Sequence, residues 1–148
     1  MSDPIAVRRL ALPVVGFDAL AAEARGEGRT FVERLADEWA SGRNRFDSAG
    51  ELLLGAFDMT TLVGVGGLNR DPYTTQPDVA RLRHLYVRPA WRRRGIGAAL
   101  VGALITRARD AGFICVRLRT SDERAARLYE KQGLVAIVEP DATHRLTF

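Results

Sequence analysis

Residues 85–100 read LYVRPAWRRRGIGAAL, and this stretch decides which fold the chain adopts. Pro89 closes an apolar strand, and Gly95 and Gly97 then open a helix. Glycines at such a junction let a ligand approach the backbone, while the unpaired N–H groups and the dipole of the helix start attract anions. The arginines at positions 92–94 add counter-charge for a pyrophosphate. The stretch therefore predicts an anion cradle between a strand and a helix.

Other phosphate-binding motifs fit these glycines less well. A dinucleotide-binding fingerprint would place a third glycine where Leu100 stands, and a P-loop would need Gly-Lys-Ser/Thr, which is absent. A plain strand-to-helix turn with a solvated basic rim is the simpler alternative. The second glycine-rich run, Gly64-Val65-Gly66-Gly67, is not followed by a helix, so we interpret it as glycines inside a strand.

Apolar periodicity around this stretch predicts a mixed sheet with helices on both faces. Apolar residues repeat at intervals of four from Ile96 to Ala108, as on a helix that lies against a sheet. This helix, at 97–111, and strands at 79–87 and 113–118 would form a right-handed βαβ unit with parallel strands. The other expected strands are 6–10, 51–57, 62–68, 134–139 and 143–148, and the other expected helices are 18–25, 30–41 and 122–132.

Turn and cap residues set the expected boundaries of these elements. Two prolines and the lack of periodicity predict a loop at 69–78. Thr30 is a plausible N-cap and Gly42 a stop signal for helix 30–41. Thr120 and Glu123 suggest a capping box for the last helix.

Composition is that of one soluble globular domain over residues 1–148. Hydrophobic residues make up 47% of the chain and charged residues 27%, and the apolar runs are too short for a membrane helix. Met1–Pro4 lacks a basic, apolar signal segment, so we expect a cytoplasmic protein without a membrane partner. The single cysteine, Cys115, lies in an apolar run and is expected to be structural. The net charge of +4 is only a weak indication of nucleic-acid binding.

Two blocks of the sequence resemble the GNAT (GCN5-related) N-acetyltransferase family. Residues 85–100 are similar to its acetyl-CoA-binding signature, whose core is Arg/Gln-x-x-Gly-x-Gly/Ala. Residues 122–134, DERAARLYEKQGL, are similar to its Asn-x-x-Ala-x-x-Leu-Tyr-x-x-x-Gly-Phe block. The clear similarity covers roughly residues 79–138. It implies an α/β (α+β) fold, GNAT-like, with a mixed, mostly antiparallel sheet flanked by helices and a central parallel βαβ unit splayed for the cofactor.

The resemblance also implies an activity and roles for individual residues. The activity is acetyl transfer from acetyl-CoA, as co-substrate, to a primary amine, and no metal is implied. The pyrophosphate would be held by the backbone N–H groups of Arg93, Arg94, Gly95, Ile96, Gly97 and Ala98, beside Arg92 at the family's Arg/Gln position. Pantetheine would pair with the backbone of Leu85, Tyr86 and Val87 like an added strand.

Gly97 and Asp122 carry further expectations. A side chain at Gly97 is expected to fill space that the phosphates need. Asp122 stands where the family has an asparagine that touches the cofactor. A carboxylate there is repelled by phosphates unless an arginine is near, so capping of its helix is the alternative role.

The second block places the Tyr129 hydroxyl beside the cofactor sulfur, as the acid that protonates the leaving thiolate. The Glu that many relatives keep near the start of the fourth strand is missing from 79–84. The general base therefore stays open between His84, His144 and a water chain. Arg81 and Arg83 in that region favour an acceptor that carries a carboxylate or another anion.

The acceptor itself, a small molecule or a peptide amine, has no signature in the sequence, and neither has the choice of acyl group. GNAT-like proteins are often dimers, so a homodimer is compatible with the sequence. Two other functions stay open: a GNAT-fold protein that binds acyl-CoA without turnover, and a nucleic-acid module that uses the basic stretch 81–94.

Overall fold

A single seven-stranded sheet organises the chain, with the strand order β1-β2-β3-β4-β5-β7-β6. The computed structural model describes residues 5–148, so Met1–Pro4, where a signal segment was judged absent, lie outside the described residues. All neighbouring strands are antiparallel except β4 and β5. The strands are β1 (Ile5–Arg9), β2 (Leu52–Asp58), β3 (Thr61–Arg70), β4 (Val79–Val87), β5 (Cys115–Leu118), β6 (Val135–Glu139) and β7 (Ala142–Thr147).

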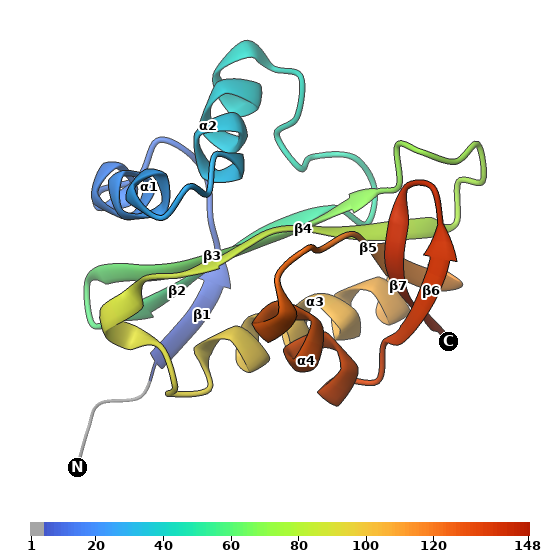
Figure 1. The fold of residues 1–148 in the computed structure, drawn as a ribbon. Helices are drawn as coiled ribbons and strands as arrows, with labels where there is room; N and C mark the ends of the chain where they lie inside the picture. The colour runs from blue at the N-terminus through green and yellow to red at the C-terminus, as the bar shows by residue number, and fades with distance from the viewer. Residues whose placement is uncertain (1–4) are drawn as a thin grey trace.

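Helices cover both faces of the sheet (Figure 1). One face carries α1 (Phe17–Gly26) and α2 (Phe31–Ser41), and the other carries α3 (Ile96–Asp110) and α4 (Glu123–Lys131). A short 3₁₀ turn, η1 (Pro89–Trp91), joins β4 to the loop before α3. Among these helices of residues 5–148, none is long and apolar enough to cross a membrane.

Each face of the sheet has its own hydrophobic core. The repeat from Ile96 to Ala108 turns Leu100 and Leu104 toward the sheet, where both are fully buried. On the other face Leu20 and Leu35 pack against β2 and β3. Burying a leucine contributes about 1.5–3 kcal/mol, so these two layers hold the helices in place. This arrangement confirms the predicted mixed sheet flanked by helices.

The glycine run in β3 lets the covering layers approach the sheet. A Cβ atom at Gly64 would lie 3.2 Å from Leu100 Cδ1, and one at Gly67 would lie 2.6 Å from Phe46 Cε1. Any larger residue would push a helix or loop away from the strand. The interpretation of this run as strand glycines is therefore confirmed.

Strands β4 and β5 separate after a short parallel pairing. They are paired only from Val79 and Cys115 to Arg81 and Arg117, although β4 continues to Val87. Within β4 a bulge sets two residues, His84 and Leu85, opposite one residue of β3, and His84 takes a left-handed φ of 60°. Bulges bend a strand and increase its twist, so β4 turns away from β5 and the sheet opens. The predicted splayed βαβ unit is thus present.

Some boundaries differ from the sequence-based expectation. β3 runs two residues further, to Arg70, because Asn69 and Arg70 pair with Arg81 and Ala80 of β4. The Glu51 carboxylate also accepts a hydrogen bond from the Arg70 N–H at 2.9 Å. The capping box of Thr120 and Glu123 is wrong. Asp122 is the N-cap of α4 instead, and its Oδ1 accepts from the N–H groups of Arg124 (2.8 Å) and Ala125 (3.3 Å). Thr30 precedes α2 without a side-chain cap bond, whereas Gly42 ends that helix in the left-handed conformation.

Candidate active site

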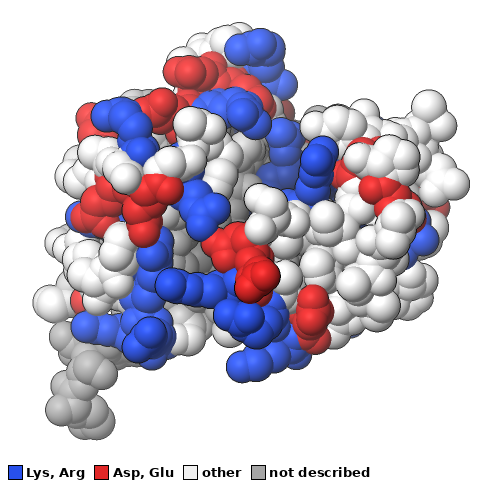
Figure 2. Space-filling view, viewed as in Figure 1, with Lys and Arg blue, Asp and Glu red and all other residues white. Residues whose placement is uncertain are grey.

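A cavity of about 1330 Å³ opens where β4 leaves β5. Its walls come from the connection between α1 and α2, from β4, from the start of α3, and from the segment that leads from β5 into α4. Figure 2 shows basic and acidic side chains gathered around the hollow between these layers. All the residues predicted to bind the cofactor border the cavity except Arg94, and so does Tyr129; of the two candidate bases, His84 borders it and His144 does not.

The start of α3 offers free hydrogen-bond donors to this cavity. Arg93 and Gly95 have left-handed φ values of 65° and 76°, which fold the loop tightly before Ile96. The first helical hydrogen bond runs from the Ala99 N–H to the Gly95 carbonyl, and no side chain within residues 5–148 caps the helix. The N–H groups of residues 96–98 therefore have no helical partner. This geometry fits a pyrophosphate.

Gly97 borders the cavity and faces α4. A Cβ atom there would lie 3.1 Å from Leu128 Cδ2 and 3.8 Å from Val87 Cγ2. Close packing of α3 against α4 is therefore one reason for a glycine at this position, and the expectation that a side chain there fills phosphate space stays a prediction. At Gly95 the surrounding space is open, and the left-handed φ is what favours glycine.

Arg92 is tied to the connection between α1 and α2. Its guanidinium donates to both oxygens of Glu27, at 2.9 and 2.6 Å, and its Nε donates to the Val87 carbonyl at 3.0 Å. The Tyr86 hydroxyl also donates to Glu27. The hydrogen bonds from Arg92 hold the pKa of Glu27 below its ordinary value. In this conformation Arg92 neutralises a carboxylate of its own chain.

Sequence reasoning missed Glu27, because a glutamate between Gly26 and Gly28 reads as part of a break between helices. A second contact crosses the cavity nearby. Arg29, also from this connection, forms an ion pair with Asp122, whose other oxygen caps α4. Hydrogen bonds from the α4 backbone and the charge of Arg29 keep the pKa of Asp122 low, although burial opposes them. Arg29 is therefore the nearby arginine that a carboxylate at position 122 needs if it is not to repel phosphates.

Tyr129 lies on the face of α4 that points into the molecule. Its side chain is buried and borders the cavity, and its ring packs 6.4 Å from that of His144. Within residues 5–148 its hydroxyl has no hydrogen-bond partner. Burial, with a smaller effect from the Asp122 charge, raises the pKa of Tyr129 above 10. The phenol consequently keeps its proton at neutral pH.

The two histidines differ in their access to the cavity. His144 binds the Glu130 carboxylate through Nε2 and the Thr143 hydroxyl through Nδ1, both at 2.9 Å, and it does not border the cavity. His84 borders the cavity, but burial and the neighbouring charges of Arg83 and Arg34 lower its pKa to about 3. A group with so low a pKa is a weak base. His144 therefore lies outside the cavity and His84 is too weak a base, so neither is suited to take a proton from the amine.

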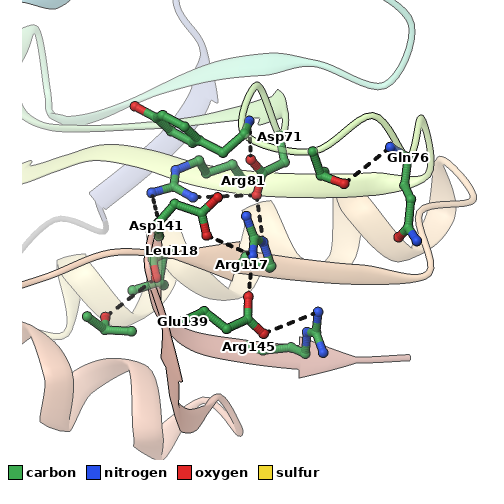
Figure 3. A network of polar contacts seen from close by, with 11 residues as sticks. Asp71, Gln76, Arg81, Arg117, Leu118, Glu139, Asp141 and Arg145 are labelled. Atoms are coloured by element: carbon green, nitrogen blue, oxygen red, sulfur yellow. Dashed lines mark hydrogen bonds and ion pairs between the residues drawn. The ribbon is translucent and has the colours of Figure 1, made fainter.

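A buried ion network forms the wall at the far end of the cavity, next to β5 (Figure 3). Arg117 Nε lies 2.8 Å and Arg81 Nη1 lies 3.4 Å from the same Asp71 oxygen. Arg81 also donates to the Asp141 carbonyl at 2.6 Å, and its guanidinium stacks on Tyr73. Arg117 pairs with Glu139 as well. Arg81, predicted to favour an anionic acceptor, is therefore already neutralised by the protein.

Comparison with known proteins identifies the family. The model of the acetyltransferase (GNAT) family matches residues 18–134, so the chain belongs to this family, whose general activity is acyl transfer. An uncharacterized protein from Mycobacterium leprae (strain TN) is 37% identical over 84 residues, or 57% of this chain. The chain spans 23% of the length of that relative.

Solved structures share the fold at low sequence identity. A proposed acetyltransferase from Exiguobacterium sp. 255-15 has a TM-score of 0.87 at 24% identity, over 98% of this chain and 94% of that one. A GNAT family acetyltransferase from Brucella melitensis in complex with acetyl-CoA has 0.74 at 18% identity, over 98% and 88%. PaiA N-acetyltransferase from Thermoplasma acidophilum in complex with coenzyme A has 0.67 at 20% identity, over 99% and 100%.

Proposed function

We propose that the chain transfers an acetyl group from acetyl-CoA directly to a primary amine. One observation carries this proposal. The start of α3 with its free N–H groups, the separated edge of β4 and Tyr129 all border one continuous cavity. The complexes of the Brucella and Thermoplasma proteins with acetyl-CoA and coenzyme A support the choice of co-substrate.

Each part of the cavity suits one part of the co-substrate. The N–H groups of residues 96–98, with Arg93, would hold the pyrophosphate. The backbone of Leu85, Tyr86 and Val87 would pair with pantetheine, because β5 no longer covers that edge of β4. Acetyl-CoA supplies an activated thioester when bound. Asp122 would contact acetyl-CoA without repelling its phosphates, because Arg29 neutralises the Asp122 carboxylate.

Proton transfer then falls to groups beside the reacting atoms. The amine nitrogen bonds to the acetyl carbon, the carbon–sulfur bond breaks, and Tyr129 gives its proton to the departing sulfur. The proton of the amine leaves to water in the cavity, because Glu27, the nearby carboxylate with a lowered pKa, is already bound by Arg92 and Tyr86. Cys115 lies on β5 away from the cavity, and burial raises its pKa. This favours direct transfer over an acyl-cysteine route.

Two measurements test the proposal. Acetyl-CoA should raise the melting temperature of the protein, while ATP and NADH at the same concentration should not, because they lack pantetheine. A panel of primary amines should then release free coenzyme A thiol in the presence of the protein and acetyl-CoA. Equal stabilisation by ATP would contradict the cofactor assignment. Stabilisation without any thiol release would indicate a protein that binds acyl-CoA without turnover.

A further inference from the structure

The part of the cavity beside α2 holds arginines that no acidic side chain neutralises. Arg34 on α2 and Arg83 on β4 both border the cavity, and within residues 5–148 neither side chain forms an ion pair or hydrogen bond. Among residues 5–148, the only carboxylates that border the cavity are those of Glu27 and Asp122, and both already pair with other arginines. Arg34 is exposed and Arg83 is half-buried. Three other arginines that border the cavity without an ion pair in residues 5–148 are also exposed and lie near the starts of α3 and α4, namely Arg93, Arg119 and Arg124.

His84 adds an unsatisfied polar group at the same place. Its side chain is 8% exposed, and both ring nitrogens are buried without a hydrogen-bond partner in residues 5–148. The ring packs between Phe31 and Phe46, with centroids 6.3 and 6.1 Å away. Arg83 is the chain neighbour of His84, and Arg34 lies one turn after Phe31 on α2, so both arginines border the cavity next to this ring. Their charges help to lower the pKa of His84. Burying a donor without a partner is unfavourable, and a ligand that supplies an acceptor recovers this cost.

The chemistry of the three groups defines what they would bind. Two guanidinium forks and the N–H of a neutral imidazole are all donors that suit a carboxylate. We infer that the acceptor amine carries a carboxylate, which Arg34, Arg83 and His84 hold while the amine points toward the edge of β4. The inference rests on the proposed acetyl transfer for the identity of the ligand as an acceptor. Of the two arginines predicted from the sequence to bind an anionic acceptor, Arg83 keeps this role. Arg81 is already paired with Asp71, so Arg34 takes its place.

Matched acceptors separate the carboxylate from the amine. Glycine and β-alanine would be compared with glycinamide and β-alaninamide, and with spermidine, in the thiol-release assay. The amino acids should have higher kcat/KM than their amides. Arg83→Gln and Arg34→Gln should each lower kcat/KM for the amino acids about 10–100-fold, the usual worth of a charge-assisted hydrogen bond, and leave the amides within twofold. Arg127→Gln, an exposed arginine of α4 away from the cavity, is the control.

A binding measurement decides the question without turnover. β-Alanine would be titrated calorimetrically into the protein saturated with coenzyme A, and into the Arg83→Gln and Arg83→Lys variants. Binding that weakens at least tenfold in Arg83→Gln and is partly restored in Arg83→Lys supports the inference, even if no amine releases thiol and acetyl transfer fails. A preference for amides or spermidine, or equal binding in all variants, would overturn it.

Discussion

Tyr129 is the residue on which the proposed chemistry depends most. Its side chain is buried and borders the cavity, and its hydroxyl has no hydrogen-bond partner in residues 5–148. Tyr129→Phe keeps the ring and removes only the proton. It should leave the melting temperature and acetyl-CoA affinity nearly unchanged while lowering kcat about 10²–10⁴-fold, the usual contribution of a general acid.

A second tyrosine provides the control for this substitution. Tyr73 also borders the cavity, but it is 57% exposed and stacks on Arg81. Tyr73→Phe should keep kcat close to that of the wild type. Wild-type turnover in Tyr129→Phe would mean that the thiolate leaves unaided or takes its proton from water, and Tyr129 would then be a packing residue.

His84 links one buried side chain to the pH dependence of stability. Its ordinary pKa is near 6.5, and burial lowers it to about 3 in the folded protein. Between these values the unfolded chain binds one more proton, so stability falls as the pH falls from 6.5 toward 3. The loss from this group is at most about 1.4 kcal/mol per pH unit. Above pH 6.5 its contribution is constant.

The variant His84→Asn removes this titration, and asparagine tolerates the left-handed φ of 60° at the bulge. Urea unfolding at pH 7.5, 6.5, 5.5 and 4.5 should show the wild type losing stability faster than the variant on the acid side. A constant difference between the two proteins at all four pH values would show that His84 titrates normally in the folded state.

At the scale of elements, the connection between α1 and α2 controls the charge of the cradle. Glu27 forms an ion pair with the guanidinium of Arg92 and places a negative charge beside the expected pyrophosphate site. Glu27→Gln should therefore tighten acetyl-CoA binding about twofold to fivefold, which corresponds to the roughly 0.3–1 kcal/mol of a partly exposed ion pair. Calorimetric titration measures the change directly.

The matched control lies one turn earlier on α1. Glu23 pairs with Arg88 at 2.7 Å, and neither residue borders the cavity, so Glu23→Gln should not alter acetyl-CoA affinity. Weaker binding in Glu27→Gln alone would show that the carboxylate positions Arg92 for the phosphates rather than competing with them.

Elements with a strong local signal were predictable from the sequence. The repeat from Ile96 to Ala108 and the βαβ order followed from periodicity, because the same side chains that make the pattern fill the core. Local polar contacts were harder, since Thr120 and Asp122 both fit the cap of α4 and only the backbone geometry selects Asp122.

Contacts across the cavity could not be read from the sequence. Glu27 meets Arg92 over 65 residues and Arg29 meets Asp122 over 93, and no periodicity relates either pair. The same holds for Arg81, whose charge is neutralised by Asp71 and which donates to the Asp141 carbonyl 60 residues away. The sequence shows an arginine near the site, but only the fold shows that Arg81 is engaged, while the side chains of Arg34 and Arg83 have no partner among the described residues 5–148.

At the scale of the whole molecule, the ion network around Asp71 joins segments that are far apart in the sequence. Asp71 follows β3, Arg117 lies on β5, and Glu139 and Asp141 belong to the β6–β7 hairpin (Figure 3). The two helical layers hold the sheet from its faces. The network instead fastens the β5 side of the open sheet and so fixes the far wall of the cavity.

The last prediction concerns Asp71, the centre of this network. Its carboxylate has no exposed surface, and the side chains of Arg81 and Arg117 are each 7% exposed. Asp71→Asn keeps the shape and removes the charge, which leaves two buried guanidiniums undercompensated. Breaking a buried ion pair in this way costs about 3–5 kcal/mol, so urea unfolding should show a loss of that size with an unchanged m-value. Glu139→Gln, at the 30% exposed rim of the same network, should cost less than about 1 kcal/mol. A loss below about 1 kcal/mol in Asp71→Asn would mean that water or the neighbouring carboxylates compensate both arginines, and the cavity wall would then depend on apolar packing alone.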